Sequence, residues 1–243
     1  MIDIHCHILP EVDDGASCME ESLEMARMAV NSGVIRIAAT PHFDGTADAL
    51  PLLSDIRQQY QALRSALIRE EIPLTLHSGA EILCLPDTLE LARNRQLPTY
   101  EGTNYVLTEF YFDESFAYMD QTLTGLRSCG YRPVVAHPER YNTIQRNPGL
   151  LRRWVKIGCA LQLNKGSILG NLGSRSQEAA HEILSMGLAH LIASDAHGCE
   201  SRTPHMGQLH HWAQEVCEEE FARILLVENP RRIVTGNSLV GEK

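Results

Sequence analysis

Short runs of β-branched and apolar residues recur along the entire chain and alternate with longer amphipathic segments. The runs predict seven strands, at residues 2–7, 36–42, 74–82, 105–110, 132–139, 160–165 and 190–197. Segments such as 19–33 and 55–71 place apolar residues three or four positions apart, which predicts helices between the strands. Seven strands that alternate with helices favour an α/β fold whose parallel sheet closes into a barrel.

The length and composition fit one globular domain. The 243 residues, 44% of them hydrophobic, suffice for a sizeable core, and no linker rich in Pro, Gly or Ser divides the chain. We therefore predict a single domain over residues 1–243. The net charge of −10 and the lack of a basic patch argue against nucleic acid as the main partner. Anionic substrates stay compatible with this charge, because bound metal ions can reverse the local field.

Cysteine usage and the apolar runs bear on the compartment. Seven cysteines are scattered without a C-x-x-C pair, which is typical of reduced thiols in a cytoplasmic protein. The first predicted strand begins at residue 2 without the basic and apolar regions of a signal peptide, and no apolar run reaches the length of a membrane span. We expect a cytoplasmic protein that does not insert into a membrane.

Side chains that bind metals stand at the ends of six of the seven predicted strands. In a parallel barrel the carboxyl ends of the strands meet at one mouth, where active residues gather. His5 and His7 lie two positions apart, so a strand would point both imidazoles to the same side. A single histidine or glutamate at a strand end is more often a structural hydrogen-bonding residue. The whole set, with one aspartate from the loop after the first strand, comprises His5, His7, Asp14, His42, Glu81, Glu109, His137, Asp195 and His197.

Five histidines and four carboxylates at one mouth predict a metal centre. This mixture of nitrogen and oxygen donors suits two or three first-row divalent ions, such as Mn²⁺, Fe²⁺, Co²⁺ or Zn²⁺. Three such ions would outweigh the charge of the four carboxylates and create a local positive field. The site would therefore attract an anionic substrate such as a phosphate ester.

Six motifs, taken in order, are similar to those of a known superfamily. They are IDIHCHILPEVDDGA, AATPHF, GAEI, AHPERY, QLNKGSILGNLG and SDAH. Together they resemble the PHP superfamily (polymerase and histidinol phosphatase), and most closely its branch of bacterial manganese-dependent protein-tyrosine phosphatases. This branch is the CpsB/CapC family of capsule and exopolysaccharide loci, and the resemblance extends from residue 2 to about residue 236.

The resemblance implies a distorted (β/α)7 TIM-like barrel, the PHP fold, with a trinuclear metal centre. We expect two or three divalent metal ions there, Mn²⁺ above all. It implies hydrolysis of phosphotyrosine on a bacterial tyrosine kinase that controls polysaccharide synthesis and export. The resemblance also implies that the nine donors above are the ligands of the metal centre. They stand in the family motifs H-x-H, D-D-G, T-P-H, G-A-E, T-E-F, A-H-P-E-R and D-A-H. The family pattern would place a proline soon after Glu109, whereas this chain reads TEFYF there.

The expected reaction is metal-assisted hydrolysis of a phosphate monoester. Divalent ions lower the pKa of water enough to supply a nucleophile near neutral pH. Arg140, the arginine of A-H-P-E-R, is expected to grip phosphate oxygens with its guanidinium fork, and Arg202 is a second candidate. Phenolate leaves readily, since the pKa of tyrosine is about 10, so little acid catalysis is needed. Further candidates for lining the pocket or supplying a proton are Asp13, Asn164, Lys165 and His205.

A second phosphatase signature, C-x5-R, occurs from Cys217 to Arg223. Cysteine-dependent phosphatase chemistry needs a loop of small residues around the phosphate and a thiolate of low pKa. Here residues 218–220 are glutamates, which repel both thiolate and phosphate, and segment 210–226 has a helical pattern. We interpret the match as a coincidence.

Three other functions fit parts of the pattern. A small-molecule phosphatase of the same superfamily, such as histidinol-phosphate phosphatase, would share the metal site and differ in its substrate loops. An amidohydrolase-type metallohydrolase also begins with H-x-H, but it commonly uses a carboxylated lysine where this chain offers Glu109. A non-catalytic interaction module would be expected to lose some donors. The intact set of nine donors and the AHPERY and DDGA strings favour the tyrosine phosphatase.

Overall fold

The computed structural model describes residues 1–241 of the chain. Within that range the strands are β1 Ile2–Cys6, β2 Arg36–Ala39, β3 His42–Asp44, β4 Thr75–Ser78, β5 Glu81–Leu83, β6 Tyr105–Glu109, β7 Arg132–Ala136, β8 Ala160–Asn164 and β9 Leu191–Ala193. The α-helices are α1 Met19–Asn31, α2 Leu52–Arg69, α3 Thr88–Arg93, α4 Phe116–Ser128, α5 Asn142–Arg146, α6 Leu151–Lys156, α7 Lys165–Ile168, α8 Ser174–Ser185, α9 Gly207–Val216, α10 Glu219–Arg223 and α11 Asn229–Val234. Shorter helical turns lie at Ala47–Ala49, Tyr100–Gly102, Pro138–Arg140, Pro148–Leu150 and Ile224–Glu228.

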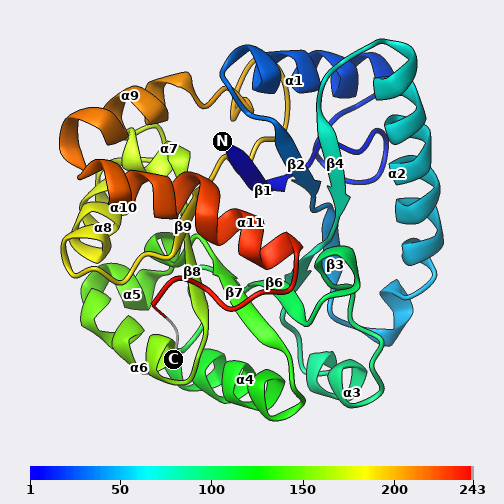
Figure 1. Ribbon diagram of the computed structural model, residues 1–243. Coiled ribbons are helices and arrows are strands. Elements are labelled where there is room, and N and C mark those ends of the chain that lie inside the picture. Colours follow the sequence, from blue (N-terminus) through cyan, green and yellow to red (C-terminus); the bar gives the residue numbers. More distant parts are fainter. Residues whose placement is uncertain (242–243) are drawn as a thin grey trace.

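The strands form two parallel sheets that together make one barrel (Figure 1). One sheet has the order β1-β2-β4, and the other has the order β3-β5-β6-β7-β8-β9. The barrel closes between its first and last strands, where the backbone N–H of Asp195 donates to the carbonyl of His5 at 2.8 Å and that of His7 donates to Ala196 at 2.8 Å. β3 continues the line of β2, and β5 continues the line of β4. The nine strands therefore occupy seven strand positions around the barrel. The distorted (β/α)7 barrel is therefore confirmed.

Two of the predicted strands are interrupted, which is a correction to the continuous strands expected at 36–42 and 74–82. The first breaks at Pro41, which has no N–H to donate to a neighbouring strand. The second breaks at Gly79, where an added Cβ would lie 3.0 Å from the ring of Tyr100 and 3.2 Å from Thr40. The two breaks lie side by side, since the N–H of Glu81 donates to the carbonyl of Pro41 at 3.0 Å. They divide the wall into two sheets and distort the barrel.

The last predicted strand is shorter than expected from 190–197. It ends at Ala193, so Asp195 and His197 stand on the loop that follows β9. Asp195 has a left-handed backbone with φ of +51°, as does His137 beyond β7 with φ of +34°. Such conformations are costly for residues other than glycine and concentrate at functional sites.

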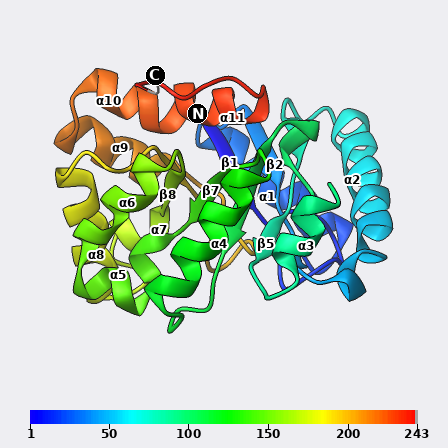
Figure 2. The ribbon, with the colours of Figure 1, turned by 90° about the horizontal axis from the view of Figure 1, so that it is seen from below.

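The core has an inner and an outer layer, separated by the strands. Alternate residues such as Leu107, Val134 and Leu191 fill the barrel, whereas Val106 packs outward against the ring of helices seen in Figure 1. Ile233 of α11 belongs to the inner layer, and this helix covers the amino end of the barrel. Figure 2 shows α10, α11 and both termini on that same side. The carboxyl ends of the strands open at the opposite side.

The helices at 19–33 and 55–71 are confirmed as α1 and α2, but the helical pattern at 210–226 contains a break. Cys217 and Glu218 are extended, with ψ of 150° and 141°, and they separate α9 from α10. Glu219 and Glu220 follow in the first turn of α10, where carboxylates interact favourably with a helix amino terminus. Across residues 1–241, we find no helix that combines the length and apolar character of a membrane span.

Candidate metal centre

Strand β1 delivers two histidines to the mouth of the barrel with the help of an irregularity. Ile2 and Ile4 pack in the inner layer, and the pairing register of β1 with β2 then shifts before Cys6. An extra residue at such a bulge changes which side chains face inward. His5 and His7 consequently point to the same place, with their Nε2 atoms 3.2 Å apart. Both side chains are fully buried.

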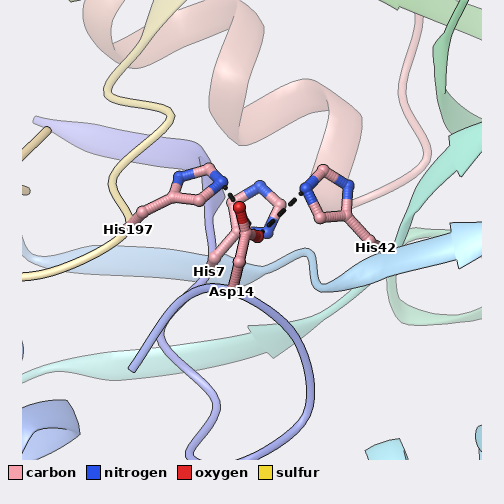
Figure 3. A group of neighbouring side chains, drawn as sticks. All are labelled: His7, Asp14, His42 and His197. Atoms are coloured by element: carbon pink, nitrogen blue, oxygen red, sulfur yellow. Dashed lines mark ion pairs between the residues drawn. The ribbon is translucent and has the colours of Figure 1, made fainter. Parts of the chain in front are cut away.

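The D-D-G loop after β1 packs closely against His7. The His7 Nδ1–H donates to Asp13 Oδ2 at 2.7 Å, and Asp13 also accepts the backbone N–H groups of His42 and Gly15 at 2.9 and 3.0 Å. A Cβ at Gly15 would lie 2.1 Å from the His7 carbonyl oxygen, so this approach requires glycine. Asp14 Oδ1 then lies 3.3 Å from an imidazole nitrogen of His42, as Figure 3 shows.

Glu81 stands at the centre of the histidines. Its Oε2 lies 3.1 Å from His5 Nε2 and 3.3 Å from both His7 Nε2 and His42 Nδ1. Its Oε1 accepts from His137 Nε2 at 2.9 Å. The side chain is 1% exposed, and Glu109 lies beside it with Oε1 3.3 Å from His42 Nδ1. One carboxylate from β5 therefore links histidines from the ends of three other strands, β1, β3 and β7.

Asp195 occupies the opposite wall and is also contacted by both candidate phosphate-binding arginines. Its Oδ1 lies 3.4 Å from His5 Nε2 and 2.7 Å from Arg202 Nη2. Its Oδ2 lies 3.5 Å from Arg140 Nη1 and accepts a hydrogen bond from Asn164. The structure therefore brings both predicted arginines to the same mouth as the nine predicted donors.

Eight of the nine predicted donors fall into three overlapping groups whose donor atoms lie within 4.8 Å of one another. These groups are His7, Asp14, His42 and His197; His5, His7, Glu81 and Asp195; and His42, Glu81 and Glu109. The ninth, His137, touches Glu81 and has its Nε2 3.8 Å from Glu109 Oε2. Nitrogen and oxygen donors converge in each group, and this mixed set fits first-row divalent ions.

The local charges favour a cation. Burial tends to raise the pKa of Asp195, but His5 and His137 outweigh it and lower that pKa to about 2. Burial likewise opposes ionisation of Glu81, yet the surrounding histidines hold its pKa well below the usual range. In return, the two carboxylates overcome the effect of burial on His5 and raise its pKa to about 10. Buried, ionised carboxylates beside imidazoles are the environment that metal ions neutralise.

His197 differs from the other histidines of the site. Burial and the neighbouring His7 lower its pKa to about 4. Its ring lies against that of His7, with centroids 3.8 Å apart, and its Nε2 is 3.5 Å from Asp14 Oδ1 (Figure 3). A neutral imidazole is the form that coordinates a metal ion.

Gln162 escaped recognition in the sequence, and Asp13 was expected to line the pocket or supply a proton rather than to position a histidine. Gln162 accepts from His5 Nδ1–H at 2.8 Å, and Asp13 holds His7 in the same manner. Such partners orient metal-binding histidines and fix their tautomers. Gln162 precedes Asn164 by two positions on β8, and this spacing was the available signal that it faces the mouth.

The remaining pocket candidates have structural contacts. Lys165 Nζ donates to the backbone carbonyls of Thr203 and His205, which ties the loop after β9 to the end of β8. Asp13 has a pKa of about 2, because its hydrogen bond and ion pair with His7 outweigh its burial. A carboxyl group of such low pKa is a poor proton donor near neutral pH.

The C-x5-R segment lacks the geometry of a cysteine phosphatase. Burial raises the pKa of the Cys217 thiol, which disfavours a thiolate. The Arg223 guanidinium is paired with Glu220 at 2.9 Å and with Glu228. The structure agrees with the interpretation that this match is a coincidence.

Comparison with known proteins finds a family and several relatives that match nearly the whole chain. The family model described as "Capsular polysaccharide synthesis, CpsB/CapC" matches residues 1–235. The tyrosine-protein phosphatase YwqE of Bacillus subtilis is 38% identical over 243 residues, which cover 98% of this chain and 93% of that protein. The tyrosine-protein phosphatase CpsB of Streptococcus pneumoniae is 31% identical over 239 residues, which cover 96% of this chain and 98% of that protein.

A solved structure shares the whole architecture. It belongs to a study of YwqE from Bacillus subtilis and CpsB from Streptococcus pneumoniae, described as unique metal-dependent tyrosine phosphatases. It matches this chain with a TM-score of 0.86 and 36% identity, covering 98% of this chain and 96% of its own. The relatives are named as tyrosine phosphatases, which favours that function over the histidinol-phosphate and amidohydrolase alternatives. With a family model that spans nearly all of its length, this chain belongs to the CpsB/CapC family of capsular polysaccharide synthesis.

Proposed function

We propose that this chain is a metal-dependent protein-tyrosine phosphatase, a hydrolase of phosphoric monoesters. Its substrate would be phosphotyrosine on a bacterial tyrosine kinase that regulates capsule or exopolysaccharide synthesis and export. The observation that carries the proposal is the convergence of histidines, carboxylates and two arginines at the mouth of a CpsB/CapC barrel. The named tyrosine phosphatases among the relatives support the same activity.

The cofactor we propose is a set of two or three divalent ions, Mn²⁺ first and Fe²⁺, Co²⁺ or Zn²⁺ as substitutes. When bound, such ions supply a nucleophile from water and neutralise phosphoryl oxygens. Each pair of donor groups has one residue in common, His7, His42 or Glu81, which is the arrangement expected where neighbouring ions have ligands in common. The residues that would hold the ions are His5, His7, Asp14, His42, Glu81, Glu109, His137, Asp195 and His197.

Arg140 and Arg202 would bind the phosphoryl group of the substrate. Both guanidinium groups form ion pairs with Asp195. The Arg140 and Arg202 side chains are 21% and 33% exposed, so a substrate at the mouth can reach them. A phosphate dianion offers a guanidinium fork two oxygens at once. Negative charge that develops toward the phenolate oxygen is stabilised by cationic groups that are already in place. A separate general acid is therefore not part of the proposal, and Asp13 orients His7 instead.

The proposal extends to the domain and the compartment. One barrel uses strands from β1 to β9, which supports a single domain over residues 1–243, although residues 242–243 lie outside the described part. All seven cysteines are free in the structure, which supports a cytoplasmic location beside the kinase.

Hydrolysis by metal-stripped protein reconstituted with Mn²⁺ tests the function. A phosphotyrosine peptide and histidinol phosphate serve as competing substrates, and His137→Ala is compared with Cys217→Ser as a control outside the site. We expect turnover of the peptide, loss with chelator, a reduction of at least about 100-fold in His137→Ala and no loss in Cys217→Ser. Preference for histidinol phosphate would assign a small-molecule substrate, and turnover that depends on Cys217 would overturn the metal-based chemistry.

A further inference from the structure

Two aromatic side chains lie exposed directly after β6. Tyr111 is 55% exposed and Phe112 is 42% exposed, and they are the aromatic members of the large apolar residues exposed within residues 1–241. The preceding aromatic, Phe110, is buried and packs edge-on against Tyr141. Neighbouring exposed aromatics form an apolar surface that is costly in water and typical of binding sites.

The structure holds Phe112 at the rim of the metal-binding mouth. Its backbone carbonyl accepts from the N–H of Asn142 at 2.7 Å, which fixes the loop. Its ring centroid lies 6.1 Å from that of His137, with the planes 73° apart. Glu109, a predicted metal ligand, stands three residues earlier at the end of β6. Phe112 therefore borders the site on the β6–β7 side, and Tyr111 is the exposed residue next to it in the same loop.

Arg140 connects this aromatic surface to the place where a phosphoryl group would bind. Its Cζ lies 4.3 Å from the centroid of the Phe112 ring, and its Nη1 lies 3.5 Å from Asp195 Oδ2. The guanidinium thus has Phe112 on one side and the centre of the mouth on the other. Only one oxygen separates the phosphorus of phosphotyrosine from its ring, so a phosphate gripped by Arg140 keeps the ring near the rim.

We propose that Tyr111 and Phe112 form an aromatic platform that binds the phenyl ring of the phosphotyrosine substrate and selects aryl over alkyl phosphates. The proposal rests on the proposed function and adds the residues that set its specificity. Two aromatic rings attract each other in offset or edge-on arrangements, beyond the gain from apolar burial. An alkyl phosphate, such as that of serine, reaches Arg140 equally well but gains nothing from the platform.

Calorimetric titration of Mn²⁺-loaded protein with phenylphosphonate and methylphosphonate tests the platform. Both probes carry the same anionic head and no ester bond, so binding is measured without hydrolysis. Two substitutions remove a ring but keep an apolar side chain: Phe112→Leu and Tyr111→Leu. Two others keep the aromatic ring: Phe112→Tyr and Tyr111→Phe. Ile68→Ala is the matched control, because Ile68 is 73% exposed on the outer helix α2.

We expect a leucine variant to weaken phenylphosphonate binding about threefold to tenfold and to leave methylphosphonate binding unchanged. The ring-retaining variants and Ile68→Ala should bind both probes like the wild type. A selective loss in either leucine variant supports the platform and identifies the ring responsible. Equal losses for both probes would mean that Phe112 acts only through Arg140, and no loss in either variant would likewise overturn the platform.

The two proposals fail in different experiments. Absence of phosphotyrosine hydrolysis by the wild type overturns the proposed function. Hydrolysis by the wild type, together with unchanged selectivity for the phenyl probe in both leucine variants, overturns the platform alone.

Discussion

Asp13 illustrates how much a single residue of the loop after β1 contributes. Its carboxylate accepts the His7 imidazole N–H and two backbone N–H groups, from Gly15 and His42. Burial would raise its pKa, but the hydrogen bond and charge of His7 lower it to about 2. The sequence presents the residue as part of a turn or as a candidate acid, whereas its contacts make it the residue that orients His7.

Asp13→Asn should weaken metal binding. The substitution removes the negative charge that fixes the His7 ring and its tautomer, and loss of such a partner typically costs about 10- to 100-fold in metal affinity. Mn²⁺ affinity of the metal-stripped protein, measured by calorimetry, checks this. Asp44→Asn, which changes an exposed carboxylate at the end of β3, is the control. Equal Mn²⁺ affinity of wild type and Asp13→Asn would contradict the assigned role.

The histidines give the metal-stripped protein an unusual dependence of stability on pH. Burial opposes protonation, but neighbouring carboxylates raise the pKa of His5 to about 10 and that of His42 to about 9. Histidine in the unfolded chain has a pKa of about 6.5. The stability contributed by these two protons is therefore complete below about pH 6.5 and lost as the pH rises toward 9 and 10. His197 acts oppositely: its pKa of about 4 makes stability fall as the pH drops from about 6.5 toward 4.

We therefore expect the free energy of unfolding of the metal-stripped protein to be greatest near pH 6.5. Urea denaturation between pH 4 and 10 measures this dependence. Saturating Mn²⁺ should diminish the alkaline decline, because coordinated imidazoles are already deprotonated in the folded state. His42→Gln should reduce the same decline without metal. Stability that rises steadily from pH 6.5 to 9.5 without metal would show that the histidines do not retain their protons.

At the level of the elements, the interrupted strands decide the shape of the mouth. Pro41 and Gly79 break two neighbouring strands at the same height, and β3 and β5 resume the wall in a second sheet. His42 and Glu81 are the first residues of these resumed strands and pair directly in register. The breaks therefore set the positions of two metal-binding side chains.

Gly79→Ala should be destabilising, because its Cβ would meet the Tyr100 ring at 3.0 Å and Thr40 at 3.2 Å in a buried position. Overpacking of this kind costs about 1–3 kcal/mol. Urea denaturation of the wild type and variant measures the difference in free energy of unfolding. Gly149→Ala is the control, since its new Cβ meets only the end of the exposed Asn147 side chain, and a change within about 0.5 kcal/mol is expected. Equal stability of both variants would show that the β4–β5 break tolerates a side chain.

For the whole molecule, the candidate metal centre lies where the two sheets meet. The first sheet supplies His5 and His7, whereas His42, Glu81 and Glu109 belong to the second. Ions shared by these residues would fasten the two sheets together at the open end of the barrel. At the other end, α11 performs the same task by apolar packing.

Removal of metal should therefore lower the melting temperature of the entire barrel. One ion at 100 times its dissociation constant contributes about 2.7 kcal/mol, which corresponds to roughly 5 °C or more for a chain of this size. Differential scanning calorimetry with Mn²⁺ and with chelator measures the change. Glu81→Gln changes a residue that belongs to two donor groups, so Mn²⁺ should raise the melting temperature of this variant less than that of the wild type. A melting temperature that is independent of metal would contradict a centre that joins the sheets.

The strand-end pattern by itself predicted the barrel, which the structure confirms, and the set of donors, whose role as metal ligands stays a prediction. It could do so because side-chain alternation along a strand and the order of strands and helices are local properties. His5 and His7 could be paired from their spacing alone. The resemblance of the motifs then indicated the family, since six short strings in order carry more information than any one of them.

Only the tertiary structure decided which groups surround those donors. Gln162 holds His5 from 157 positions along the chain, and Arg140, just beyond β7, meets Asp195, which follows β9. The bulge in β1 and the break at Gly79 likewise depend on what packs against them. Such contacts join residues far apart in sequence, and they form only when the sheet closes, so no local pattern records them.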